Sequence, residues 1–168
     1  MNNKAEFRSF CSYGWHKGFY NDKDTKKSLL DINYTDFFEK PLDEEFPYDS
    51  AYELLCGSCH HFSLSLQKIL NYNPYIIEGN NHVGFHSFCQ IYRKKRWYYI
   101  DARGITTSFD EFMEIAKNFV SDEYTIRPVG PNDIDEWEKD SDYNEEALAF
   151  AEAVIVKYKE CYTLSNEG

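Results

Sequence analysis

Two short runs of alternating apolar and polar residues constrain the fold of this chain more than any other feature. They occupy residues 86–92 (HSFCQIY) and 96–101 (RWYYID), and the basic stretch 93–96 joins them. Alternation with a period of two is typical of a strand with one buried face, and two such runs in close succession predict an antiparallel hairpin. The basic stretch predicts a solvated turn whose charges keep the edge of the sheet soluble.

A helix precedes this hairpin. Apolar residues recur at helical spacing over 59–70, with Ser58 as the expected N-cap, and residues 71–74 (NYNP) end the segment. A short strand over 75–78 and a turn at 79–81 then lead into the hairpin. The segment between the helix and the hairpin therefore adds one more strand to the predicted sheet.

Helices also follow the hairpin. Gly104 is expected to end its second strand, and Ser108 is expected to open a helix because Ser108 and Glu111 have the spacing of a capping box. A strand over 123–128 and a long final helix capped by Asp142 complete the chain. A helix, a strand meander and flanking helices together predict the α+β class.

The length and composition favour one folded domain over residues 1–168. A chain of 168 residues can bury a sizeable core, and an aromatic content of 18% argues against disorder. The core is expected at about 50–128. Residues 1–46 are rich in aromatic side chains but show no clear period, and the C-terminal segment is acidic and helical.

The charge of the chain is negative and uneven. The net charge is −11, and residues 123–168 alone carry 12 acidic and 4 basic side chains, a net charge of −8. Most of such a surface repels a polyanion, so general nucleic-acid binding is not expected.

The sequence contains no recognisable membrane or export segment. No stretch approaches 18 consecutive apolar residues, and the N-terminal residues lack the apolar core of a secretory signal. Five cysteines without such a signal indicate reduced thiols in a cytoplasm. A chain delivered as an effector by a specialised secretion route would have the same features.

Three residues have the types and the order of a nucleophilic triad. Cys59 begins the predicted helix, His86 begins the first hairpin strand and Asp101 ends the second. A helix N-terminus supplies partial positive charge and backbone N–H groups that favour a thiolate. A neighbouring imidazole can take the thiol proton, and a carboxylate can hold that ring in the required tautomer. The sequence therefore predicts Cys59 as nucleophile, His86 as base and Asp101 as the residue that orients the base.

These residues resemble the transglutaminase-like branch of the papain-like cysteine enzyme superfamily. The resemblance rests on Gly57-Ser58-Cys59 at a helix start, His86 at a strand start and Asp101 15 residues later, an order that arylamine N-acetyltransferases share. Residues 99–104 (YIDARG) also resemble small bacterial and phage-type members. The resemblance covers residues 50–112 and implies a papain-like fold in which the nucleophile helix packs on an antiparallel sheet.

Residues 56–63 (CGSCHHFS) resemble the nucleophile motif of papain itself, with departures. His60 follows the cysteine where papains have tryptophan, and the only glutamines, Gln67 and Gln90, lie downstream of the cysteine rather than upstream. His86 also lies much nearer in sequence to the cysteine than the papain histidine does. The transglutaminase-like order therefore fits this chain better.

The triad and the resemblance together imply acyl transfer through a thioester on a protein or peptide amide. Attack by the thiolate would form an acyl-enzyme. Water would then complete a deamidation or a peptide hydrolysis, and an amine would complete a cross-link. This chemistry implies no metal and no organic cofactor. The sequence leaves open the substrate, the acyl acceptor and the oligomeric state.

Other interpretations use the same cysteines and histidines. Cys56, Cys59, His82 and His86 spell C-x2-C and H-x3-H, a pattern typical of Cys2His2 zinc sites, although the interval between the two pairs is longer than usual. Cys56 and Cys59 alone could form a redox pair, and with His60 they match a c-type haem attachment pattern. Buried cysteines are also often inert. A non-catalytic protein-binding module on the same fold, an inhibitor or adaptor, is a further alternative.

Three other histidines, His82, His60 and His61, bear on the choice of base. His82 competes with His86 for the role of base. Pairing of the two hairpin strands brings Asp101, at the end of the second strand, toward the start of the first strand, and this favours His86. His60 and His61 lie in the first helical turn. They are expected to line a cleft or face solvent, because the helix should hold them pointing away from the thiol.

The remaining candidates have simpler expected roles. Arg103 is expected either to guide an anionic group of a substrate or to pair with the acidic surface, and the second role is favoured. The other cysteines outside the C-x2-C pattern are expected to pack in the core: Cys11, Cys89 and Cys161.

Overall fold

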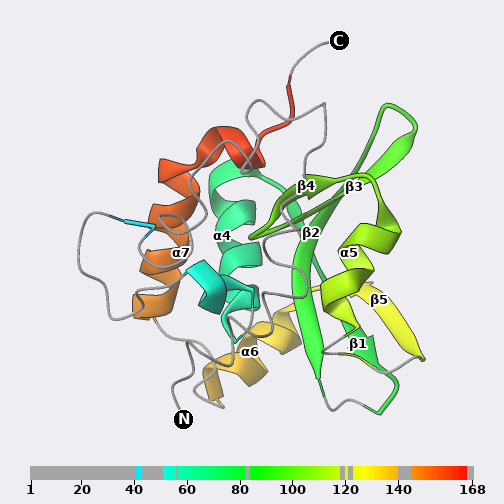
Figure 1. Cartoon of the computed structure of the whole chain (residues 1–168). Coiled ribbons are helices and arrows are strands. Elements are labelled where there is room, and N and C mark those ends of the chain that lie inside the picture. The colour runs from blue at the N-terminus through cyan, green and yellow to red at the C-terminus, as the bar shows by residue number, and fades with distance from the viewer. Residues whose placement is uncertain are drawn as a thin grey trace.

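An antiparallel sheet organises the part of the chain that the computed structural model describes, residues 41–42, 51–55, 57–81, 84–117, 120, 123–139 and 145–165. Its five strands lie in the order β4-β3-β2-β1-β5 (Figure 1). The strands are β1 Asn73–Gly79, β2 Phe85–Arg93, β3 Arg96–Asp101, β4 Gly104–Thr106 and β5 Tyr124–Pro128. The first four form a meander, and β5 pairs with β1 at the opposite edge.

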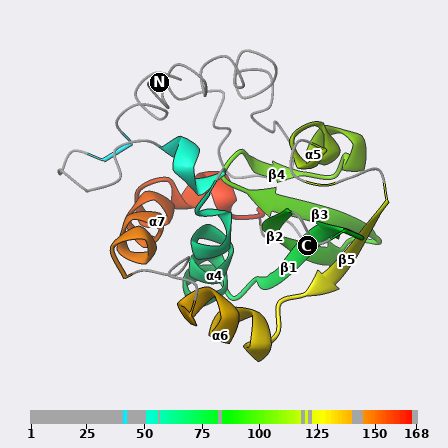
Figure 2. The ribbon, with the colours of Figure 1, turned by 90° about the horizontal axis from the view of Figure 1, so that it is seen from below.

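Helices lie on both faces of this sheet. They are α4 Cys59–Leu70, α5 Phe109–Ala116, α6 Pro131–Lys139 and α7 Glu145–Lys157, with 3-10 turns η2 Ala51–Leu54 and η3 Lys159–Tyr162. α4 packs on the sheet and against α7, whereas α5 lies on the other side (Figures 1 and 2). This arrangement confirms the predicted α+β class.

The alternation along the strands sends successive side chains into two separate hydrophobic clusters. On β2, Cys89 packs in the cluster that α4 and α7 share, and its neighbour Phe88 packs against α5. On β3, Ile100 joins the first cluster and Tyr99 borders the second. Burial of one large apolar side chain contributes about 1.5–3 kcal/mol, so the two clusters hold the sheet firmly between its helices.

The predicted hairpin is confirmed as β2 and β3. Their register runs from Cys89 opposite Ile100 to Arg93 opposite Arg96. The strands are joined by Lys94 and Lys95 alone, and both adopt the left-handed region, with φ of 53° and 62°. A two-residue turn with positive φ at both positions has the twist that antiparallel strands require, although Asn-Gly is the sequence that usually adopts it.

The first turns of two helices differ in detail from the capping predicted for them. Ser58 occupies the N-cap position of α4, but its hydroxyl makes no capping hydrogen bond. At α5, the Glu111 N–H donates to Ser108 Oγ at 3.2 Å, as the capping box predicts. The Glu111 carboxylate instead accepts a 2.6 Å hydrogen bond from Thr106, whose Oγ1 also accepts from the Ser108 N–H at 3.0 Å. Thr106 therefore completes the cap and ties α5 to β4.

Some expectations about the elements were wrong or are not covered by the structure. Gly104 does not end the second hairpin strand; it begins β4, and its φ of 109° is a conformation that glycine adopts without strain. α6 was not predicted. The final helix begins at Glu145, and its expected cap, Asp142, lies outside the described residues, as do residues 1–40.

The helices that the structure describes include none that is both long enough and apolar enough to cross a membrane.

We predict that Lys94→Asn/Lys95→Gly stabilises the protein, because two lysines now occupy a left-handed conformation that costs about 1 kcal/mol for an ordinary side chain. A gain of about 1 kcal/mol would raise the Tm by about 2–4 °C in a chain of this size. Thermal unfolding followed by circular dichroism would measure it. Lys94→Gln/Lys95→Gln is the matched control, since it removes the charges and keeps the strain. An equal gain in that control would mean that charge, not backbone conformation, limits stability at the turn.

Candidate active site

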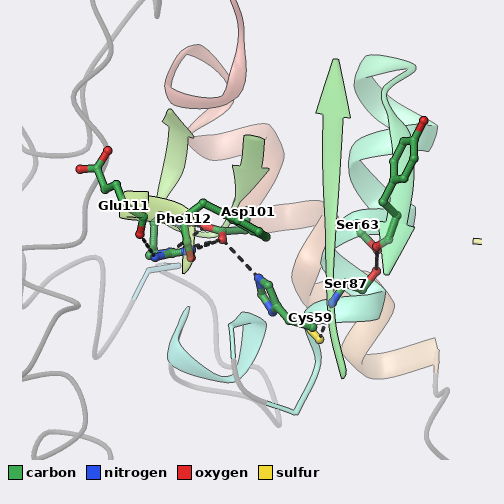
Figure 3. Close-up of polar contacts among 9 residues, drawn as sticks. Cys59, Ser63, Ser87, Asp101, Glu111 and Phe112 are labelled. Carbon is green, nitrogen blue, oxygen red and sulfur yellow. Dashed lines mark hydrogen bonds and ion pairs between the residues drawn. The ribbon is translucent and has the colours of Figure 1, made fainter. Parts of the chain in front are cut away.

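The structure brings the three predicted triad residues together. Cys59 is the first residue of α4, His86 the second of β2 and Asp101 the last of β3. His86 Nε2 lies 3.2 Å from Asp101 Oδ2 (Figure 3). The His86 ring also lies close enough to the Cys59 thiol for each group to shift the pKa of the other. Because Nε2 faces Asp101, Nδ1 is the ring nitrogen that remains for Cys59.

The strand register explains how His86 meets Asp101. Cys89 pairs with Ile100, so one further step along the same register sets Asp101 beside Phe88. Phe88 and His86 are two residues apart and point to the same face, and their rings stack with centroids 6.2 Å apart. The two triad residues are therefore diagonal neighbours across the strands, a separation that long side chains span.

Hydrogen bonds between α4 and β2, here called the seam, fix the position of the Cys59 sulfur. The Ser87 backbone N–H donates to Cys59 Sγ at 3.4 Å, and the Ser87 hydroxyl contacts the Ser63 hydroxyl at 2.6 Å (Figure 3). Ser87 Oγ also donates to the Tyr75 carbonyl at 3.1 Å. One helical turn after Cys59 on α4, the Ser63 carbonyl accepts a hydrogen bond from Cys89 Sγ at 3.4 Å. These contacts hold the first turn of α4 in register with the strand that carries His86. Apart from the serines themselves, no sequence pattern predicts this seam.

The turn into α4 depends on glycine. Gly57 has a φ of 107°, which an L side chain rarely adopts, and it reverses the chain between η2 and α4. The Ser58 N–H then donates to the Glu53 carbonyl at 2.7 Å. This sharp turn leaves Cys59 at the very start of the helix, where the partial positive charge of the helix N-terminus is greatest.

Hydrogen bonds and neighbouring charges outweigh burial and favour the charged form of the triad. Burial alone would raise the pKa of the Cys59 thiol, but hydrogen bonds from His60 and His86, and the charges of these rings, lower it from 9.0 to about 6. Burial alone would lower the pKa of His86, but its hydrogen bonds to Asp101 and Cys59, and their negative charges, raise it from 6.5 to about 9. At neutral pH the proton therefore resides on His86, opposite a Cys59 thiolate.

Arg103 is a site residue that the sequence interpretation misjudged. It is fully buried, with 0% of its surface exposed, so it neither pairs with the acidic surface nor waits for a substrate anion. Its Nη2 lies 2.6 Å from Asp101 Oδ2, and its backbone N–H donates to Asp101 Oδ1 at 2.9 Å. Burial alone would raise the pKa of Asp101, but the Arg103 charge and the hydrogen bonds from both partners hold it well below its usual value. An arginine two residues after an aspartate that ends a strand is the signal that could have found this pair.

His60 and His61 also lie elsewhere than expected. Both are buried, and His60 lies close enough to the Cys59 thiol to lower its pKa rather than pointing away from it. Helical side chains lean toward the N-terminus of the helix, which brings the His60 ring back toward the preceding residue. Burial, together with the charge of His60, lowers the pKa of His61 to about 4, so His61 is neutral at physiological pH.

The unpredicted helix α6 supplies an aromatic wall beside these histidines. The Trp137 ring lies 4.9 Å from that of His60 and stacks on Phe85 at 5.8 Å. A capping pattern positions α6: the Gly130 N–H donates to Asp133 Oδ2 at 2.7 Å, and Pro131 opens the helix. Proline at the first position and an acid at the third were the available signals for this helix.

The alternative zinc set is only partly described. Cys56 and His82 lie outside the described residues, and the other two members, Cys59 and His86, each shift the pKa of the other. Among the described residues, no cluster of three or more metal-ligating side chains has the geometry to hold a metal ion. The cysteines Cys89 and Cys161 are buried in the core as predicted, and Cys11 lies outside the described residues.

Comparison with known proteins gives no further guide: no family model matches the sequence, and no curated protein or solved structure is significantly similar to it.

We predict that iodoacetamide alkylates Cys59 faster than any other cysteine at neutral pH. Acid protonates the thiolate, so the rate should fall as the pH drops through about 6 and should change little above that value. Peptide mass spectrometry across a pH series would measure it. Cys89 is the internal control, because burial raises its pKa well above the usual value and it should stay unlabelled in the folded protein. Faster labelling of another cysteine would show that the nucleophile is misassigned.

Proposed function

We propose that this protein is a cysteine-dependent acyltransferase or hydrolase that acts on a protein or peptide amide, with a papain-like domain of the transglutaminase-like type. The row Cys59–His86–Asp101 carries this proposal: His86 lies 3.2 Å from Asp101, and the His86 ring lowers the pKa of the Cys59 thiol. The row supports it because each member is held in the protonation state that attack on a carbonyl needs. The packing of α4 on an antiparallel sheet supports the proposed fold type, since the resemblance implies a nucleophile helix packed on such a sheet.

In the proposed reaction, the Cys59 thiolate attacks the carbonyl carbon of the amide and a C–S bond forms. The oxygen gains negative charge, and the Cys59 backbone N–H at the start of α4 is the expected donor to it. His86 then gives its proton to the leaving nitrogen, the C–N bond breaks and a thioester remains. This step consumes the imidazolium that the resting pair provides.

The second half of the reaction restores the Cys59 thiolate and the His86 imidazolium. Neutral His86 takes a proton from water or from an amine, which attacks the thioester carbonyl, and the C–S bond breaks. Water yields an acid, so the net reaction is deamidation or peptide hydrolysis, and an amine yields a new amide. Both protons pass through His86, so the proposed steps call for no metal and no organic cofactor.

A non-catalytic binding module would not need this charge arrangement. Such a module uses its surface, whereas Cys59 is 6% exposed. Its sulfur accepts from the Ser87 N–H at 3.4 Å, and His60 and His86 lower its pKa. Lowering a buried thiol pKa requires these contacts to outweigh desolvation. The contacts that do so favour the enzyme over the binding module.

We predict that Asp101→Asn and His86→Ala each slow acylation of Cys59 by about a hundredfold or more, because the first misorients the imidazole and the second removes it. Mass spectrometry after exposure to a panel of glutamine- and peptide-based electrophiles would identify a reactive probe and give its rate. Asp110→Asn, an exposed carboxylate on α5, is the matched control and should leave the rate unchanged. His82→Ala should also cost little. A loss in His82→Ala as large as in His86→Ala would mean that the base is misassigned.

The reaction should also have a bell-shaped pH profile. Below about pH 6 the Cys59 thiolate is protonated, and above about pH 9 His86 loses the proton that the leaving nitrogen needs. The value of kcat/KM should therefore rise through the first value and fall through the second. A profile that keeps rising past about pH 9 would contradict an imidazolium as the acid.

A further inference from the structure

Arg103 makes contacts that exceed what is needed to neutralise Asp101. Its Nε donates to both carboxylate oxygens, at 3.1 and 3.2 Å, and its Nη2 donates to Oδ2 at 2.6 Å. The same Oδ2 is the atom that faces His86 Nε2 at 3.2 Å. The guanidinium and the imidazole therefore share one oxygen and lie close to each other.

The remaining donors of Arg103 fix the guanidinium in place. Nη1 donates to the Glu111 carbonyl at 3.3 Å, and Nη2 also donates to the Phe112 carbonyl at 3.1 Å, both on α5. The backbone of the turn is held as well, because the Tyr162 hydroxyl donates to the Ala102 carbonyl at 2.9 Å. Arg103 thus connects α5, the β3–β4 turn and Asp101 in one rigid unit.

We propose that Arg103 is a positioning residue that fixes the Asp101 carboxylate toward His86 and offsets its negative charge, so that His86 is oriented by Asp101 without being locked in the protonated state. This role deepens the proposed function and rests on it in assigning His86 as the proton carrier.

The offset matters when Cys59 is acylated. In the resting state, two negative groups, the Cys59 thiolate and the Asp101 carboxylate, stabilise the imidazolium. Once the sulfur has bonded to the carbonyl carbon, its charge is gone, and Asp101 alone would hold the proton on His86 while the leaving nitrogen is still attached. A cation on the far side of Asp101 weakens that hold, because charges this close in a buried site act strongly on each other. His86 can then release its proton to the leaving nitrogen and act as a neutral base.

Several titratable or charged groups face His86 and Asp101 from the surrounding elements. They are Cys59 and His60 on α4, Arg103 in the β3–β4 turn, Tyr162 on η3 and Glu111 on α5. Burial raises the pKa of Tyr162 well above its usual value, so that hydroxyl stays neutral. The Glu111 carboxylate accepts a hydrogen bond from Thr106. Glu111 faces Arg103 with its backbone carbonyl rather than with its charged carboxylate. Arg103 is therefore the cation that sets the balance at Asp101.

The test is an NMR titration of His86 in the full-length chain, with Cys59→Ser to remove the thiolate and a His86→Gln variant to assign the signal. Adding Arg103→Met should raise the pKa of His86 by about 1 unit or more, because Asp101 is then uncompensated. Adding Arg103→Lys, which keeps the charge, should raise the pKa of His86 by only a small fraction of that shift. Arg127→Met is the matched control, since Arg127 also pairs with two carboxylates, Glu78 and Asp133, but away from His86.

A second pair of variants covers the case in which Arg103→Met alone does not fold. Asp101→Asn/Arg103→Met removes both charges of the buried pair, which proteins tolerate better than removal of one. Compared with Asp101→Asn in the same Cys59→Ser background, it should again raise the pKa of His86. The proposal would be overturned if the pKa of His86 rose in neither comparison. It would also be overturned if Arg103→Lys raised that pKa as much as Arg103→Met. The titration needs no turnover, so it tests the role of Arg103 separately from the proposed reaction. If the pKa of His86 does not shift, Cys59 can still be the nucleophile. If no acyl transfer is found, a shifted pKa still supports the role of Arg103.

Discussion

The burial of Asp101 between a guanidinium and an imidazole is the interaction on which the rest of the site depends. A carboxylate that is 1% exposed cannot remain ionised without partners, because desolvation of an isolated charge is costly. Arg103 supplies the first partner at 2.6 Å and His86 the second at 3.2 Å. The ionised carboxylate favours the imidazolium, and the imidazolium favours the thiolate. The site is thus a row of alternating charges, Arg103, Asp101, His86 and Cys59, in which each member keeps its neighbour charged.

Such a row requires three elements to be held in fixed relation, and the core and the seam do this in different ways. The two hydrophobic clusters hold α4 and α5 on opposite faces of the sheet, but apolar packing alone allows small shifts of a helix along a strand. The Ser63–Ser87 contact at 2.6 Å and the Ser87 N–H to Cys59 contact at 3.4 Å are directional, so they fix where the first turn of α4 sits along β2. α5 is fixed in the same way, through the carbonyls that accept from Arg103. The hydrogen bonds therefore set the distances, and the clusters supply the stability.

Local patterns in the sequence were sufficient to predict the fold class and to bring the triad residues together. The bounds of α4, the β2–β3 hairpin and β5 follow from periodicity and turn residues, and the order helix start, strand start, strand end places Cys59, His86 and Asp101 at one end of the sheet. What could not be predicted depends on contacts between residues distant in sequence or on burial. The spacing of Asp101 and Arg103 can indicate a pair, but the burial of that pair depends on α5 packing over it, and an arginine is mostly exposed otherwise. The orientation of His60 depends on the packing of Trp137 from α6, a helix that begins 71 residues later and whose capping signals are short.

A buried pair such as Asp101–Arg103 is not explained by stability. Replacing a buried ion pair by apolar side chains of similar volume is often neutral or stabilising, because desolvation of the two charges offsets much of their attraction. Apolar residues at both positions could have closed the β3–β4 turn by packing against Phe112, whose ring already lies 6.0 Å from the guanidinium. An apolar closure would leave His86 with no carboxylate to orient it, and a lone aspartate would hold the imidazole proton too tightly. Only the pair does both things, which places the reason for Arg103 in the chemistry proposed for His86 rather than in the fold.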